Sequence, residues 1–246
     1  MPVEFIADLH IHTCLSPCAE LSMTPRNIVE RAASLGINIL AVCDHNAAEN
    51  VAVTKDLAKK KGIHVIAGME INSSEEVHII GLFPDMDSVL EMQEIVYRSL
   101  QPGENDEDLF GMQVVVNERN EVLQFNKRLL IGATALSVNS IVELLHGCGG
   151  LAVASHIDRD GFGIIGQLGF IPAELDFDAL EISRSITGTE ASARFGAYRH
   201  IPWISSSDAH RIEDIGRRTT RFFMRHSTFE ELRLALKGAE GRKTIF

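Results

Sequence analysis

Apolar residues recur along the chain in short runs, and amphipathic segments separate one run from the next. A short apolar or alternating run bounded by turn residues is typical of a strand, whereas apolar positions three or four residues apart are typical of a helix. The runs predict strands at 3–11, 37–43, 64–71, 77–83, 151–155, 179–183, 202–206 and 219–224. Repeated alternation of strands with helices predicts an α/β fold on a parallel sheet, open or closed.

Helix start and stop signals mark the segments between these strands. Thr24 is the expected N-cap of the first helix and Pro25 its first residue, because proline is favoured where no amide hydrogen bond is needed. Ser227 and Glu230 have the spacing of a capping box, which predicts a closing helix up to Gly238. The other expected helices cover 48–61 and 189–198.

One segment, 101–134, interrupts this rhythm. It opens with an acidic run at 104–108 and continues as two short strands, 113–117 and 121–125, which predict a hairpin. We interpret the segment as an insertion within a single domain that spans residues 1–246, not as a second domain.

Length and composition narrow the class of protein. The chain has 246 residues, 45% of them hydrophobic, which suffices for one substantial core. No uncharged stretch reaches the ~18 apolar residues that a membrane-spanning helix needs. The first basic residue is Arg26, so the N-terminus lacks the pattern of a secretory signal, and we expect a cytoplasmic protein whose four cysteines remain thiols.

The charge balance is acidic, with a formal net charge of −11. Phosphate backbones are captured mainly by surplus lysine and arginine, so this balance argues against polymeric nucleic acid as a partner. Small phosphorylated ligands stay compatible with it, because bound cations can outweigh the net charge at short range.

Histidine and acidic residues gather at the ends of the apolar runs, where a core strand has no use for them. The residues that share this placement are His10, His12, His45, Glu70, His78, His156, Asp208 and His210. In a barrel of parallel strands the carboxyl ends lie at one mouth, so residues far apart in the sequence would meet there. A single histidine at such a place is more often structural, but this set favours a metal site with several ions.

The same residues carry a resemblance to a known family. The segments resemble those of the PHP domain family, the polymerase and histidinol phosphatase type phosphoesterases: Asp8-Leu9-His10-Ile11-His12-Thr13, Cys43-Asp44-His45-Asn46, Gly68-Met69-Glu70, Glu76-Val77-His78, Ser155-His156 and Ser207-Asp208-Ala209-His210. The resemblance implies a distorted TIM-like barrel of seven β/α units with a small hairpin insertion. It also implies two or three divalent ions (Zn, Mn or Fe) and hydrolysis of phosphate esters.

The resemblance further implies which residues bind each ion. The first ion would be bound by His10, His12, Glu70 and Asp208. Glu70 would bridge to a second ion, bound also by His78 and His156. A third ion would rest on His45, His210 and a residue of the loop after His12, for which Cys18 is the candidate because Pro17 has no donor. A thiol without a ligand role is the alternative for Cys18.

Two bridged ions would lower the pKa of a shared water and so provide a hydroxide near neutral pH. Asp208 could also orient this water or accept its proton. Arg159 and Arg184 are the candidate substrate-binding residues, since a guanidinium offers a fork to phosphate oxygens. Arg159 matches the arginine of a His-Pro-Gly-Arg motif in the nucleotide phosphatase and exonuclease branch of the family, although Ile157 and Asp158 replace Pro and Gly.

These observations favour a metal-dependent phosphoesterase that acts on a small phosphorylated metabolite, with a nucleotide bearing a terminal phosphate as the favoured substrate. The alternatives are a histidinol phosphatase, a nuclease that trims single strands, and a metal-binding regulatory module without activity. The sequence leaves the oligomeric state open.

Overall fold

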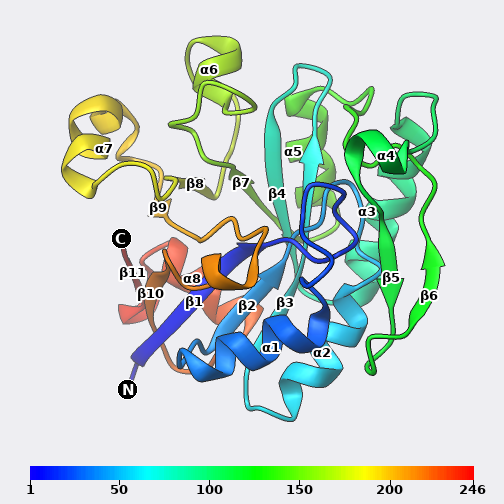
Figure 1. Ribbon diagram of the computed structural model, residues 1–246. Helices are drawn as coiled ribbons and strands as arrows, with labels where there is room; N and C mark the ends of the chain where they lie inside the picture. Colours follow the sequence, from blue (N-terminus) through cyan, green and yellow to red (C-terminus); the bar gives the residue numbers. More distant parts are fainter.

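The computed structural model describes residues 1–246, and nine strands form one sheet around a barrel-like interior (Figure 1). Their order is β11-β10-β1-β2-β3-β4-β7-β8-β9. The strands are β1 (Val3–Ile11), β2 (Ile39–Val42), β3 (His64–Asn72), β4 (His78–Phe83), β7 (Leu151–Ala154), β8 (Ala179–Glu181), β9 (Trp203–Ile204), β10 (Thr220–Met224) and β11 (Lys243–Ile245). The two ends of this order, β9 and β11, come close together, and the rings of Trp203 and Phe246 lie 5.7 Å apart there. The sheet is therefore nearly closed.

The sheet is mixed, which corrects the expectation of an all-parallel arrangement. β1, β2 and β3 are parallel, as are β7, β8 and β9, but β4 is antiparallel to both of its neighbours and β10 is antiparallel to β1 and β11. Residues 73–77 join β3 to β4, which is too short for a crossover helix and permits only a hairpin. The fold is thus α/β with a barrel-like sheet, and the expected count of seven β/α units is not confirmed.

The direction of β4 decides which of its ends faces the carboxyl ends of the parallel strands. Its first residue, His78, pairs with Asn72, the last residue of β3. The start of β4 therefore lies at the same edge of the sheet as the ends of β1, β2 and β3.

The expected helices are present, with one shift in a cap. Thr24 caps α1 (Pro25–Ser34) by accepting a hydrogen bond from the amide of Asn27. The closing helix, α8 (Phe229–Leu236), is capped by Thr228, whose hydroxyl accepts from the amide of Glu231, so the predicted capping pair Ser227 and Glu230 is wrong by one residue.

The remaining helices surround the sheet. They are α2 (Val51–Lys59), α3 (Met86–Ser99), α4 (Glu107–Phe110), α5 (Val138–Gly147), α6 (Ile164–Leu168) and α7 (Gly188–Phe195), with 3₁₀ turns at Gly196–Tyr198, Ile212–Asp214 and Ala239–Gly241. α3 and α5 were not predicted from the sequence. None of the helices combines the length and the apolar character needed to cross a bilayer.

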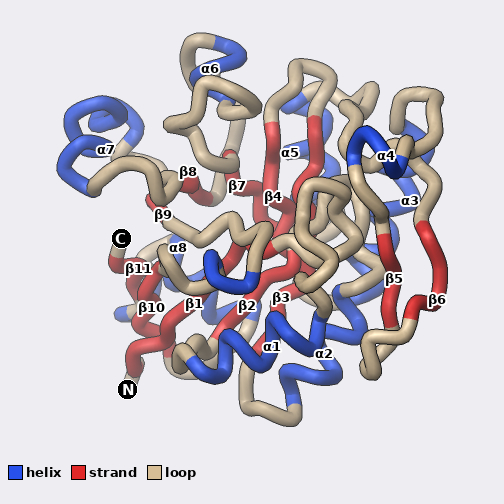
Figure 2. Tube along the Cα trace, viewed as in Figure 1, coloured by secondary structure: helices blue, strands red, loops and turns tan.

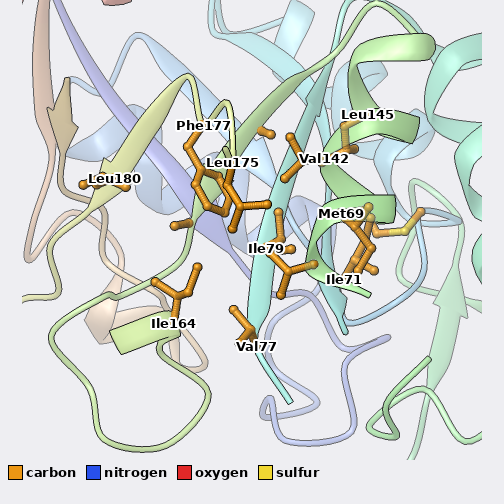
Figure 3. Packing of buried hydrophobic residues seen from close by; sticks show 14 of the residues in the cluster. Met69, Ile71, Val77, Ile79, Val142, Leu145, Ile164, Leu175, Phe177 and Leu180 are labelled. Carbon is orange, nitrogen blue, oxygen red and sulfur yellow. The ribbon is translucent and has the colours of Figure 1, made fainter. Parts of the chain in front are cut away.

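Apolar cores lie on both faces of the sheet. On one face, side chains such as Leu9, Ile80 and Phe222 pack with Leu232 of α8. On the other face, β4 and β7 pack against α5 and β3 packs against α3, and Figure 3 shows Met69, Ile79 and Leu145 in this layer. Because the strands are buried on both faces, their sequences are runs of apolar residues. A polar residue within such a run therefore indicates a special role.

The segment 101–134 contains the predicted hairpin, β5 (Val114–Val116) and β6 (Val122–Phe125), which stands apart from the main sheet (Figure 2). Asn50, beside the start of α2, fixes β5, since its amide donates to the carbonyl of Val114 and its carbonyl accepts from the amide of Val116. That this segment is an insertion within one domain stays a prediction.

Gly68 in β3 offers a test of the packing between β2 and β3. A Cβ at this position would lie 2.7 Å from both Cys43 Sγ and the carbonyl oxygen of Val42. We therefore expect Gly68→Ala to lower the free energy of unfolding by about 1–3 kcal/mol, as overpacking of a core does. Urea unfolding measures this change.

The control is Gly147→Ala at the end of α5, where a Cβ meets nothing within 4 Å. It should leave stability unchanged or raise it, because alanine favours a helix over glycine. Equal stability of the two variants would contradict the account of this strand pair.

Candidate metal centre

The strand ends bring the predicted polar residues together at one edge of the sheet. They come from the end of β1 (His10, His12), the residues after β2 (His45), β3 (Glu70), the start of β4 (His78), the turn after β7 (His156) and the loop after β9 (Asp208, His210). Backbone bridges between Ile11 and Ala209 and between His45 and Glu70 hold these loops against the sheet. The predicted convergence is therefore observed, with β4 contributing its first residue because it runs the opposite way.

The side chains of His10 and His12 face two acids at close range. Their Nε2 atoms lie 3.1 Å apart. Asp208 Oδ1 is 3.4 Å from His10 Nε2 and 3.2 Å from His12 Nε2, and Glu70 Oε1 is 3.3 Å from His10 Nε2. These are the separations expected of donor atoms that each stand about 2.0–2.2 Å from one ion.

Glu70 lies at the middle of the cluster and is 1% exposed. Its Oε1 is 3.1 Å from His78 Nδ1 and 3.4 Å from His156 Nε2, whereas its Oε2 is 3.2 Å from His45 Nδ1. Each of its two oxygens thus faces a different set of imidazoles, as a bridging carboxylate requires.

The hydrogen bonds behind His10 and His12 determine which ring nitrogens carry protons. His10 Nδ1 lies 3.0 Å from Glu181 Oε2, and a carboxylate can only accept, so His10 Nδ1–H is the donor. His12 Nδ1 lies 3.0 Å from Ser16 Oγ, whose own hydrogen goes to Asp44 Oδ1 at 2.6 Å, so His12 Nδ1–H donates as well. In the neutral rings both Nε2 atoms then present lone pairs to each other, an arrangement that a cation between them stabilises.

The titration of these groups reflects buried acids among imidazoles. Burial opposes charge, yet Glu181, Glu70 and Asp208 raise the pKa of His10 well above its usual value. Burial lowers the pKa of His12 to about 4. The pKa of Glu70 and that of Asp208 stay well below their usual values despite burial, because neighbouring histidines favour the carboxylates. The cluster therefore holds anionic oxygens in a buried place, which requires compensating positive charge.

Three buried atoms of the cluster form no well-aligned hydrogen bond, although the first two lie close together: Glu70 Oε1, His78 Nδ1 and His156 Nδ1. Unpartnered buried polar atoms are costly and rare, so a group of them in one place calls for an explanation. Imidazole nitrogens with carboxylate oxygens are the donor set that suits Zn²⁺, Mn²⁺ and iron. The residues thus fit divalent ions.

Three groups of donor atoms are close enough to share an ion: His10, His12 and Asp208; His45, Glu70 and His78; and His12, His45 and His210. The first group holds the expected residues except Glu70, and the second pairs Glu70 with His78 as expected but holds His45 in place of His156. The third pairs His45 and His210 as expected but completes the set with His12. Cys18 is exposed and lines the same cavity, although it belongs to none of these groups.

Buried polar residues support the cluster from behind, among them Asp8, Asp44 and Asn46. Asp44 accepts hydrogen bonds from Thr13 and from Ser16, and Ser16 in turn positions His12. Burial raises the pKa of Asp44 to about 6, although these donors oppose the shift.

Asp8 and Asn46 act on loops. Asp8 accepts from the amides of Ser207 and Gly216, which fixes the segment that carries Asp208. Pairing of β1 with β2 is irregular between Asp8 and Ile11, where the strand reaches the cluster.

The backbone is strained at the cluster. Asn46, His156 and Asp208 have φ values of 53°, 28° and 49°, a region that residues other than glycine seldom adopt. Each such conformation costs on the order of 1–3 kcal/mol, and strain of this kind gathers at functional sites. These conformations lower local stability, but they orient the three side chains for their roles at the cluster.

Glu181 is a site residue that the sequence analysis did not identify. It is 1% exposed at the end of β8, and its Oε2 accepts from His10 Nδ1–H at 3.0 Å and from the amide of His156 at 3.1 Å. A glutamate in an otherwise apolar strand was the available signal. Its role is to orient two imidazole-bearing residues.

A cavity of about 220 Å³ opens beside the cluster. Its lining residues are Cys18, His45, Glu70, His78, Ile131, His156, Arg159, Phe162, Asp208 and His210. Ile131 comes from the end of the 101–134 segment, which Asn46 holds by donating to the carbonyls of Leu130 and Gly132. The hairpin β5–β6 itself does not line this cavity.

The two arginines proposed for substrate binding lie in different surroundings. Arg159 lines the cavity, and its Nη2 is 2.6 Å from Asp208 Oδ2. Arg184 Nη1 is 2.8 Å from Asp214 Oδ1, and this arginine is not among the lining residues. The structure therefore brings Arg159 to the cluster, whereas substrate binding by Arg184 stays a prediction.

The sequence is similar to a known protein family and to several individual proteins. The family model of the PHP domain matches residues 8–160, and that of the PHP-associated region matches residues 190–240. A 5'-3' exoribonuclease of Haemophilus influenzae is 26% identical over 188 residues, which are 61% of this chain and 68% of that protein. A 3',5'-nucleoside bisphosphate phosphatase of Chromobacterium violaceum is 35% identical over 78 residues, 30% of this chain and 26% of that protein.

Among solved structures, endonuclease Q of Pyrococcus furiosus superposes with a TM-score of 0.74 at 22% identity, over 99% of this chain and 58% of that chain. The chain thus spans little more than half the length of this structural relative. A second endonuclease Q structure is a complex with a 27-mer duplex substrate. Our expectation from net charge that polymeric nucleic acid is an unlikely partner is wrong, because the proteins that this chain resembles include nucleases.

Glu181→Gln tests the support of the cluster. The substitution keeps the shape of the side chain but removes the carboxylate charge that makes Nε2 of His10 a stronger metal ligand. We expect divalent-ion affinity about 10–100-fold weaker, the usual effect of changing a residue behind a metal ligand. Calorimetric titration of Mn²⁺ or Zn²⁺ into metal-free protein measures it, with Glu94→Gln on the exposed face of α3 as control. Equal affinities of wild type and Glu181→Gln would refute this role.

Proposed function

We propose that this chain, which belongs to the PHP domain family of metal-dependent phosphoesterases, hydrolyses a phosphoester at the end of a nucleotide unit. The observation that carries the proposal is the buried cluster around Glu70, where imidazoles and carboxylates meet beside a small cavity that also holds an arginine. Such a site can bind several cations and a phosphate together.

His10, His12, Glu70 and Asp208 would bind the first ion, and Glu70 would extend to a second with His78 and His156. His45 and His210, with Cys18 or His12, would complete a third position. The bound ions would activate a water for attack on phosphorus and neutralise charge on the phosphoryl oxygens. The hydrogen bonds that His12 and His10 donate from Nδ1 to Ser16 and Glu181 leave their Nε2 atoms facing the cluster for this purpose.

Asp208 and Arg159 would act together on the reacting groups. Oδ1 of Asp208 faces the imidazoles and Oδ2 binds Arg159, so the carboxylate is fixed between them. Oδ1 is then placed to orient the attacking water or accept its proton. The guanidinium of Arg159 has five N–H donors, and those not used by Asp208 can bind a phosphate oxygen within the cavity.

A nucleotide end fits the dimensions of the site. The cavity, about 220 Å³, is below the ~300 Å³ at which pockets begin to enclose a drug-sized ligand. A phosphate with part of a sugar can enter, and the rest of the molecule must remain at the rim. The nucleoside bisphosphate phosphatase and exoribonuclease relatives act, by their names, on nucleotide phosphoesters, which supports this substrate class.

A second candidate is the terminal phosphodiester of a nucleic acid strand. The similarity to the Haemophilus influenzae exoribonuclease favours it. Chemistry at phosphorus would be the same, and the leaving group alone would differ.

Arg159→Ala tests the phosphate-binding step. We expect the variant to retain its ions but to lose kcat/KM by about 100-fold or more, because the guanidinium contact to phosphate and the fixed position of Asp208 are both removed. The assay is phosphate release from nucleoside 5′-monophosphates and 3′,5′-bisphosphates with Mn²⁺, and a chelator should abolish activity in the wild type.

Arg184→Ala is the matched comparison. Asp214 holds this guanidinium outside the cavity, so we expect a smaller loss. An equal loss would show that Arg184 contacts the substrate as well, and undiminished turnover of Arg159→Ala would remove Arg159 from the site.

Cys18→Ala tests the third ion position. If the thiol is a ligand, the variant should retain one ion fewer per chain than the wild type, as measured by elemental analysis after dialysis. Cys148→Ala, which alters a thiol that does not line the cavity, controls for the loss of a thiol elsewhere. Unchanged occupancy in Cys18→Ala would assign the third position to the histidines alone.

A further inference from the structure

Phe162 lines the cavity and has a strained backbone conformation. It has a φ of 60°, in the left-handed region that is unfavourable for a bulky side chain, and 43% of the residue is exposed. This residue lowers stability in two ways. Its ring exposes apolar surface to water, and its backbone has a conformation that glycine or asparagine would adopt more readily. Strain combined with exposure beside a candidate active site indicates a role in binding.

The ring of Phe162 is fixed in orientation by its contact with His78. The two ring centroids are 4.5 Å apart and the planes are inclined by 19°, and the backbone carbonyl of Phe162 accepts the amide hydrogen of His78 at 2.9 Å. His78 covers one face of the phenyl ring. The exposed remainder of the ring is therefore presented to the mouth of the cavity.

The loop that carries Phe162 also carries Arg159, and it is tightly built. A Cβ at Gly163 would collide with the carbonyl of Arg159, so the chain folds directly back on itself here. Asp158 anchors the loop by accepting from the amide of Ser183 at 2.7 Å and from its hydroxyl at 2.6 Å. Arg159 and Phe162 are thus held in a fixed relation, one beside Asp208 and the other at the rim.

We propose that Phe162 is the base-stacking platform of the site, on which the nucleobase of the reacting nucleotide lies while Arg159 and the ion cluster hold its phosphate. This inference rests on the proposed function and specifies its substrate class. A purine or pyrimidine stacks on an aromatic ring regardless of its sequence, and one such contact corresponds to about five- to a hundredfold in affinity. The small cavity takes the phosphate, and the base remains outside, where Phe162 is exposed.

The group that stacks on Phe162 is a nucleobase, either of a free nucleotide or of the terminal nucleotide of a nucleic acid strand. Both sources present the same flat ring at the same distance from the phosphate. A purely structural role, in which Phe162 only shields His78 from water, predicts instead that every phosphoester is affected alike.

The test compares Phe162→Leu with the wild type on substrates with and without a base. We expect KM for nucleoside 5′-monophosphates and 3′,5′-bisphosphates to rise about tenfold while kcat changes less than twofold. For ribose 5-phosphate both constants should stay within twofold. Phe162→Trp should restore the KM for nucleotides, and Phe170→Leu, at another exposed phenylalanine that does not line the cavity, should behave as the wild type.

A 5′-phosphorylated trinucleotide serves as a separate arm that distinguishes the two sources of the base. A tenfold effect of Phe162→Leu on either the nucleotides or the trinucleotide supports the platform and identifies its source. An equal loss on ribose 5-phosphate and nucleotides, or no loss on any base-containing substrate, would overturn it. Nucleotide hydrolysis that Phe162→Leu leaves unchanged would overturn the platform alone, whereas wild-type protein that hydrolyses no nucleotide and no trinucleotide would overturn the proposed function too.

Discussion

The concentration of imidazole and carboxylate donor atoms in one buried place is the constraint on which the rest of the structure depends. Two imidazole nitrogens face each other at 3.1 Å, with the carboxylates of Glu70 and Asp208 alongside, so positive charge must lie among them. Without ions a proton on His10 supplies this charge, in line with its raised pKa. Hydrogen bonds to Glu181 and Ser16 fix the rings of His10 and His12 so that their Nε2 atoms face the cluster. Bound cations would replace the proton, and the chemistry proposed for the site depends on them.

The barrel-like sheet makes such a concentration possible. Parallel strands deliver their last residues to one edge, and the reversed strand β4 delivers its first residue there. Strained turns at His156 and Asp208 then aim side chains that regular strands would direct elsewhere. These strained turns lower the stability of the fold. Bound ions would offset this loss, because ions that bind only the folded state stabilise it.

Much of the site was predictable from the sequence, because strand ends and metal-binding residue types coincide at separated positions. His10, His45 and Asp208 could be assigned to one edge without coordinates. Glu181 could not, since a single acid in a strand gives no sign of which imidazole it contacts. Phe162 was equally hidden, because its importance lies in a backbone conformation and an exposed ring rather than in its residue type.

Other features depended on context that a one-dimensional pattern lacks. The direction of β4 is fixed by the short connection 73–77, although its apolar run looks the same in either direction. The closing helix begins one residue later than its capping spacing suggested, since Thr228 rather than Ser227 accepts the helix amide. Net charge misled on nucleic acid because it averages over the whole surface, whereas recognition of phosphate is local.

The most direct test of the central claim is anomalous X-ray diffraction from crystals of the protein loaded with Mn²⁺. The account predicts at least two anomalous peaks within the cluster, about 3.5–4 Å apart and on either side of Glu70. A map without peaks there, or with peaks only at surface carboxylates, would contradict it.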